Sequence, residues 1–203
     1  MKRFWIFFLL AALSACAGPG RISSAWVKPG NIAFTPTRVI VFCVVPLADS
    51  SLRVPMEQHL ADDLRTMGFP AQPGSVKYAS VHLAAMSRDS AYSVLRSDSV
   101  DAVVTIVLKA AGREVLPVEQ RSAQYQQWQF PGYYHKVESE AAIPETVTFM
   151  HRYWESNTYN LLTRELLATL QTESFDAGSA AQSAHEYGKL VSTHLQAAGV
   201  FRR

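Results

Sequence analysis

The six histidines could bind a metal ion or act as general bases, and they are spread along the whole chain. They are His59, His82, His135, His151, His185 and His194. No two have the i, i+4 spacing of a zinc-binding helix or the H-x-H spacing of a strand. His185 and His194 share one expected helix, but nine residues apart they lie on opposite sides of it. The sequence therefore predicts no metal site.

Motifs for nucleophilic and acid–base chemistry are also absent from the sequence. Serines are plentiful, but no Gly-x-Ser-x-Gly elbow occurs and no glycine-rich phosphate loop follows an expected strand. Asp62 and Asp63 are adjacent on an expected helix, so their side chains diverge by about 100° and cannot share a proton. We expect them on a solvated helix face. We predict no catalytic residue, no cofactor and no enzymatic activity, and keep a serine-type envelope hydrolase as an alternative.

The amino-terminal residues predict secretion. A basic start at Lys2 and Arg3 is followed by an uncharged apolar segment over residues 4–13 and then by Leu13-Ser14-Ala15-Cys16. An apolar segment of about ten residues is half the length of a spanning helix, which predicts a cleaved signal over residues 1–15. The last four residues resemble the lipobox of bacterial lipoproteins. This resemblance implies diacylglycerol on the Cys16 thiol and acylation of the amine freed by cleavage.

Lipidation would attach the chain to a membrane, because two or more acyl chains give stable anchoring. Ala17 in place of Asp resembles the signal for export to the outer membrane of Gram-negative bacteria, which implies a protein facing the periplasm. Residues 16–37 are rich in glycine and proline and predict a flexible tether, with Trp26 as a docked point. About 20 extended residues reach at most about 65–70 Å. A single domain is expected over residues 38–203.

The charge of the mature chain excludes nucleic acid as a partner. The formal net charge is +2, but loss of Lys2 and Arg3 with the signal leaves 17 basic against 17 acidic residues. No run of lysine and arginine supplies the electrostatic attraction that nucleic acid or anionic headgroups require. Cys43 lies inside an apolar run, so we expect a small buried side chain rather than a reactive thiol.

The pattern of the domain predicts an α/β fold, with a mixed sheet packed by helices in the order β-α-β-α-β-β-β-α. Continuous apolar runs at 38–46 and 100–107 are typical of central strands. Residues 52–67 and 87–97 are expected helices, with Arg53 and Glu57 paired on the outer face of the first. An edge strand is expected within 71–85, and an antiparallel hairpin over 147–159 and 165–175. Ser179 and Gln182 predict the cap of a last helix that stops at Gly199.

The segment over about 120–142 has an unusual composition, in which the glutamines at 124, 126, 127 and 129 are interleaved with aromatic residues. We expect a protruding loop or β-arm. Exposed aromatic and glutamine side chains are suited to binding a protein or glycan; the alternative is a satellite cluster folded back on the domain. The candidate partner-binding residues are Trp128, Phe130, Tyr133 and Tyr134.

The chain resembles a broad group of uncharacterised bacterial lipoproteins. The resemblance rests on three segments: Ser24-Ala-Trp26-Val-Lys28-Pro29, the spacing of Arg53, Glu57, Leu60, Leu64 and Gly68, and residues 155–179, which include Glu173-Ser-Phe-Asp-Ala-Gly-Ser179. It implies a fold similar to the amino-terminal domain of TolB and the periplasmic domains of LpoB and CsgG, whose common theme is binding envelope partners. Arg164-Glu165-Leu166-Leu167-Ala168 departs from the pattern, because it lacks the aromatic residue expected early in the last strand.

Three functions follow as hypotheses. The first is a non-catalytic module, tethered through its lipid, that docks an envelope protein through an exposed sheet edge or the aromatic segment. The second is the hydrolase described above. The third is an envelope component that assembles with copies of itself.

Overall fold

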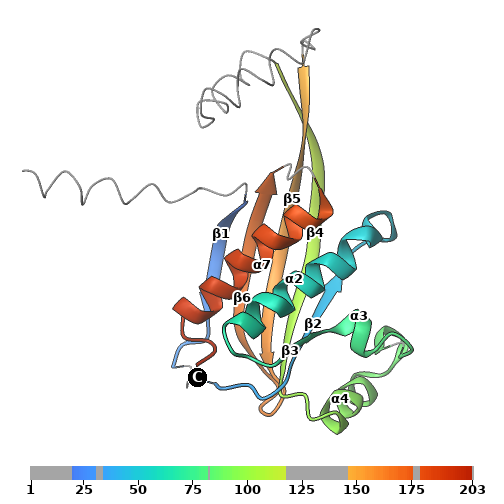
Figure 1. Ribbon diagram of the computed structural model, residues 1–203, viewed down its shortest axis with the longest axis vertical. Helices are drawn as coiled ribbons and strands as arrows, with labels where there is room; N and C mark the ends of the chain where they lie inside the picture. Colours follow the sequence, from blue (N-terminus) through green and yellow to red (C-terminus); the bar gives the residue numbers. More distant parts are fainter. Residues whose placement is uncertain (1–19, 31–33, 82, 118–145, 176–178, 203) are drawn as a thin grey trace, which may run out of the picture.

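The computed structural model describes residues 20–30, 34–81, 83–117, 146–175 and 179–202 (Figure 1). Within these residues the strands form one six-stranded sheet in the order β1-β6-β5-β4-β2-β3. The strands are β1 (Gly20–Val27), β2 (Val39–Val44), β3 (Ala71–Pro73), β4 (Ala102–Pro117), β5 (Thr146–Asn160) and β6 (Glu165–Phe175). Because β2 is parallel to β3 and β4 while the other pairs are antiparallel, the sheet is mixed, as the sequence predicts.

The helices lie on both faces of the sheet, and from β2 onward the main elements follow the predicted order. They are the 3-10 helices η2 (Leu47–Leu52) and η3 (Leu83–Ala85) and the α-helices α2 (Arg53–Thr66), α3 (Gly74–Lys77), α4 (Arg88–Ser97) and α7 (Ala180–Ala197). None of the described helices is long and apolar enough to cross a membrane. The Ser179 hydroxyl accepts the Gln182 backbone N–H at 3.1 Å, and Gly199 follows α7 at φ +65°. The predicted signals for this helix are thus confirmed.

The main core lies between the sheet and the helices α2 and α7, which run side by side across one face (Figure 1). The alternating residues Val104 and Ile106 of β4 and Trp154 of β5 face these helices and are at most 2% exposed. On α2, Leu60 and Leu64 recur at helical spacing and are fully buried against them. Removing an apolar side chain of this size from water stabilises the fold by about 1.5–3 kcal/mol.

A smaller cluster covers part of the opposite face of the sheet. Ile40 and Val103 pack there with Tyr78, just after α3, and with Val94 and Leu95 of α4. These helices lie over the end of the sheet where β4 begins (Figure 1). No described helix packs over the strands β1 and β6 on this face.

Two predictions about strands need correction. Residues 20–27, assigned to the flexible tether of 16–37, form the edge strand β1, and Trp26 is 44% exposed rather than docked. A register shift between Ile22 and Ser24 breaks the alternation of side chains, which hides the strand from pattern recognition. The strand expected over 100–107 continues to Pro117, because β5 pairs with it along its whole length.

Candidate functional site

The residues selected from the sequence lie outside the described part of the chain. They are the lipid-attachment residue Cys16 and the aromatic residues Trp128, Phe130, Tyr133 and Tyr134. The structure instead describes the elements that flank them, β1 after Cys16 and the strands β4 and β5 on either side of residues 118–145. The candidate site is therefore built from these three strands.

The end of the sheet at which β1 begins lies close to Cys16 in the sequence. Gly20, the first residue of β1, pairs with Ser174 of β6, which pairs with Arg152 of β5. Arg152 in turn pairs with Ala111 of β4. These four residues therefore form one row across the sheet, and Cys16 precedes that row by four residues.

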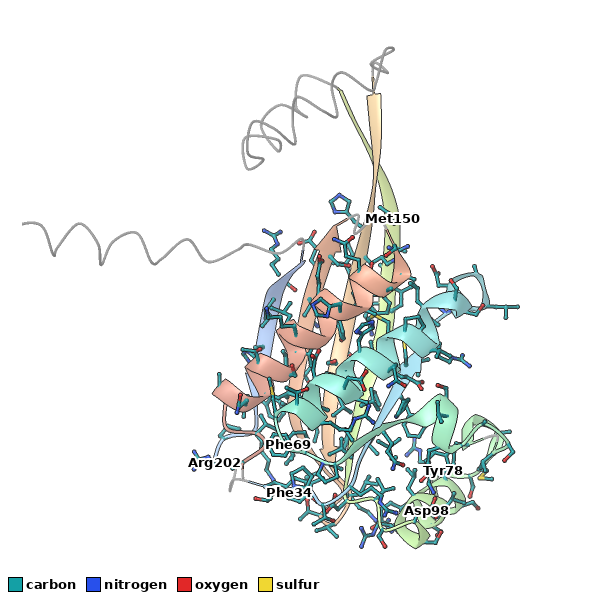
Figure 2. The ribbon with its side chains drawn as sticks, viewed as in Figure 1. Phe34, Phe69, Tyr78, Asp98, Met150 and Arg202 are labelled. Atoms are coloured by element: carbon teal, nitrogen blue, oxygen red, sulfur yellow. The ribbon has the colours of Figure 1, made fainter. Side chains whose placement is uncertain are left out.

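From the same end of the sheet β4 and β5 continue as a two-stranded arm, defined here as residues 113–117 and 146–150 (Figure 1). Pairing of β5 with β6 ends at His151 and Phe175, whereas pairing of β4 with β5 continues to Pro117 and Thr146. Figure 2 places Met150 at this end and Asp98 at the opposite end of the molecule. Within the described residues the arm strands pair only with each other.

The outer side of β1, eight residues long, forms one edge of the sheet. Lys28, directly after β1, donates its backbone N–H to the Leu167 carbonyl at 2.9 Å. Since hydrogen-bonded and non-hydrogen-bonded pairs alternate in an antiparallel ladder, Trp26 also bonds inward while Ala25 and Val27 direct their N–H and C=O groups outward. No described strand pairs with that outer side. Such an edge is a template for a further strand.

Beside this edge, the part of the sheet face that no described helix covers carries a cluster of polar residues at the base of the arm. The Glu173 carboxylate, 6% exposed, accepts two hydrogen bonds from the Arg21 guanidinium at 2.6 and 2.9 Å. His151 Nδ1 lies 3.6 Å from the other carboxylate oxygen, and Tyr153 is a further hydrogen-bond donor. The bonds from Arg21 hold the pKa of Glu173 below its usual value, although burial opposes them. The cluster ties β1, β6 and β5 together.

A second polar chain continues across the same face. Thr169 donates to the Asn157 side-chain oxygen at 2.7 Å, and the Asn157 amide donates to Glu155 at 3.0 Å. Lys109 lies 3.9 Å from the same carboxylate group. With Trp26 and Tyr153 both more than 40% exposed, this face combines polar groups with aromatic rings. These groups can form hydrogen bonds to a polar partner, so the face is suited to binding.

A third cluster of ionisable residues lies between α2 and α7, and the sequence did not predict it. The Asp63 carboxylate turns toward α7 instead of solvent, and one oxygen is buried without a hydrogen-bond partner. Burial raises its pKa, while His185 and His59, whose rings meet edge-on at 5.7 Å, oppose the shift. Gly188 makes the approach possible, since a Cβ there would lie 2.5 Å from the Asp63 oxygen. No group in the described residues could hold a metal ion.

Cys43 has the environment of a structural residue. It is 4% exposed, and burial raises the pKa of its thiol to about 12, with Glu57 adding to the shift. Glu57 is buried rather than paired with Arg53 on the outer face, and accepts the backbone N–H groups of Cys43 at 2.9 Å and Ser75 at 2.6 Å. It replaces the hydrogen bonds that the short β3 does not supply.

Comparison with known proteins returns solved structures only. No protein-family model and no curated protein match the chain. PelC from Paraburkholderia phytofirmans, crystallised as a dodecamer, aligns with 10% identity and a TM-score of 0.47, covering 91% of this chain and 99% of that one. The lipoprotein GNA1162 from Neisseria meningitidis aligns with 12% identity and a TM-score of 0.44, covering 80% and 99%. The implied likeness to TolB, LpoB and CsgG stays a prediction.

Proposed function

We propose that this chain is a non-catalytic, lipid-anchored protein of the bacterial envelope. It docks another envelope protein, which adds a strand of its own to the outer edge of β1. In a Gram-negative host it would face the periplasm from the outer membrane, through acyl chains on Cys16. The proposal names a class of partner, a protein segment in extended conformation, and places its binding on the body of the domain.

The outward hydrogen-bonding groups of Ala25 and Val27 carry the proposal. An added strand would pair with both residues without disturbing the inward bonds that hold β1 to β6. Main-chain bonds of this kind supply affinity, while side chains on alternate positions supply specificity. Trp26 and Ser24 lie on the side of β1 that no described helix covers, where a partner side chain would meet them.

A proline at position 25 tests the edge directly. Ala25→Pro removes an outward N–H and keeps the bonds to β6, and proline is tolerated on edge strands. Ala25→Thr is the matched control, because it adds a side chain and keeps the N–H. A photoreactive benzoylphenylalanine at Ser23 reports the partner in intact cells. We expect a specific crosslink with the wild-type edge and with Ala25→Thr, and its loss with Ala25→Pro; an unchanged crosslink in the proline variant contradicts the proposal.

The aromatic segment is a second proposed contact for the same partner. Trp128, Phe130, Tyr133 and Tyr134 belong to the chain that joins β4 to β5, so they follow directly from the arm in sequence. Deletion of residues 124–134 is expected to leave the melting temperature unchanged and to weaken the crosslink from Ser23. If the crosslink keeps its full yield, the segment does not take part in docking.

Self-assembly is the alternative that the same edge favours, because the strands of two copies can pair with each other. The mass of the crosslinked product distinguishes the two: twice the mass of the chain means a second copy, and any other mass means a different protein. Light scattering on the lipidated protein in detergent provides an independent measurement, in which a monomer excludes stable self-assembly.

A further inference from the structure

We infer that the β4–β5 arm contacts the surface of the membrane in which the lipid anchor is embedded. This inference rests on the proposed lipidation of Cys16, and it assigns a second partner, a lipid surface, to a part of the chain separate from the outer edge of β1. Two observations carry it: the small number of residues between Cys16 and β1, and the residue types along the arm.

The distance between Cys16 and the sheet is short compared with the arm. Four residues, fully extended, place the Cα of Cys16 at most about 14 Å from Gly20. Ala111 lies in the same row, two residues before the arm, and Pro117 lies six residues beyond Ala111, which is about 20 Å along the strand. When the sheet stands upright on the membrane, the end of the arm therefore reaches the lipid surface even if residues 17–19 are fully extended.

The residue types along the arm change from charged at its base to uncharged at its end. At its base the arm holds two charged residues, Arg113 and Glu114. The last three register pairs hold no charged residue: Val115 with Thr148, Leu116 with Val147, and Pro117 with Thr146. Within the arm, charged residues are thus confined to its base, and its last three pairs are apolar or carry hydroxyl groups; the next charged residues along the chain, Glu119 and Glu145, lie outside the described residues.

The backbone limits how deep the arm can enter. Beyond His151 both of its edges lack a partner strand within the described residues. Unpaired N–H and C=O groups are too costly in the hydrocarbon core, where no water can satisfy them. At the level of the headgroups, water and lipid oxygens remain available. The arm is therefore placed in the interface rather than across the membrane. Contact there would also support a two-stranded ribbon, which is only marginally stable alone in water.

Fluorescence of the full-length lipidated protein in vesicles tests the inference. In a Cys43→Ala background, the polarity-sensitive dye NBD is attached to Thr148→Cys in the arm or to Ser97→Cys, the control at the end of α4. Each protein is reconstituted into phosphatidylethanolamine–phosphatidylglycerol vesicles with or without a lipid that carries a nitroxide near its headgroup. We expect the dye at position 148 to shift its emission to shorter wavelength and to lose intensity with the nitroxide lipid, and the dye at 97 to show neither change.

The remaining outcomes overturn the inference in distinguishable ways. Equal behaviour of the two dyes in protein that floats with the vesicles leaves the anchor intact and excludes contact of the arm with lipid. A shift at position 148 without quenching means burial against protein. Protein that does not float and lacks the mass of acyl chains has no anchor, which overturns the lipidation in the proposed function as well.

Discussion

Gly20 is paired with Ser174 at the end of β6, so the folded sheet begins four residues after Cys16. A lipid anchor at Cys16 would hold the domain within about 14 Å of the membrane, because four extended residues span no more. On this proposal the edge strand β1 would start near the membrane and run away from it. A partner strand added to this edge would reach from the lipid surface toward the far end of the domain.

Replacing Glu57 is expected to destabilise the domain without affecting the docking edge. Glu57→Ala leaves the buried N–H groups of Cys43 and Ser75 without acceptors, which costs about 3 kcal/mol of unfolding free energy. Glu57→Gln keeps one oxygen acceptor and should cost less. Urea denaturation measures both; equal stability of Glu57→Ala and the wild type would show that these bonds contribute nothing.

The contribution of Glu173 to stability should depend on pH. Because its pKa is lowered in the folded state, its stabilising effect is present above the usual carboxyl value of 4.5 and is lost as the pH falls through the folded-state pKa. Glu173→Gln should therefore be less stable than the wild type at pH 7, by roughly 1 kcal/mol. At pH 3 the two proteins should approach each other. Thermal unfolding at both pH values measures this, and a constant difference would be inconsistent with the ion pair to Arg21.

The contribution of Asp63 to stability should depend on pH in the opposite direction to that of Glu173. Burial raises its pKa above the usual 3.8, so its charged form is unfavourable in the folded state, and stability is lost as the pH rises through the folded-state pKa. Asp63→Asn should therefore raise the melting temperature at pH 7 and leave it nearly unchanged at pH 3. Asp62→Asn is the matched control, because Asp62 pairs with Arg65 on the outer surface. A loss of stability in Asp63→Asn at pH 7 would contradict this account.

We predict that the protein has no catalytic nucleophile, and two labelling reagents test this prediction. A fluorophosphonate reagent should label no serine of the folded, lipidated protein. The Cys43 thiol should react with a disulfide reagent at pH 8 only after unfolding, since burial raises its pKa to about 12. Stoichiometric labelling of one serine in the native protein would support the hydrolase instead.

The sequence predicted the elements whose patterns are strong and local. The apolar runs around Val39 and Val103 identified the central strands, and Ser179 with Gln182 identified the start of α7. It missed β1, because an edge strand with one face in solvent and a bulge after Ile22 has no clear period. That strand forms through its pairing with β6, nearly 150 residues away in the chain.

The candidate site depends on contacts that no local pattern reveals. Glu57 has the spacing of a surface partner for Arg53, yet it is buried because β3 is too short to bond with the end of β2. Asp63 lies in a polar part of the sequence that is typical of a solvated helix face, yet α7 packs beside it at Gly188. The sequence did not reveal the partners of Glu173, since Arg21 and His151 come from two other strands. In each case tertiary packing decides the role of a charged residue.

Hydrogen exchange at single amides of β1 tests the docking edge most directly. In the purified protein, the N–H groups of Ala25 and Val27 should exchange quickly, whereas those of Trp26 and Lys28, bonded toward β6, should be protected. Addition of solubilised envelope proteins from the host is predicted to slow exchange at Ala25 and Val27 and to leave Trp26 and Lys28 unchanged. Fast exchange at Ala25 and Val27 in both samples would contradict the account.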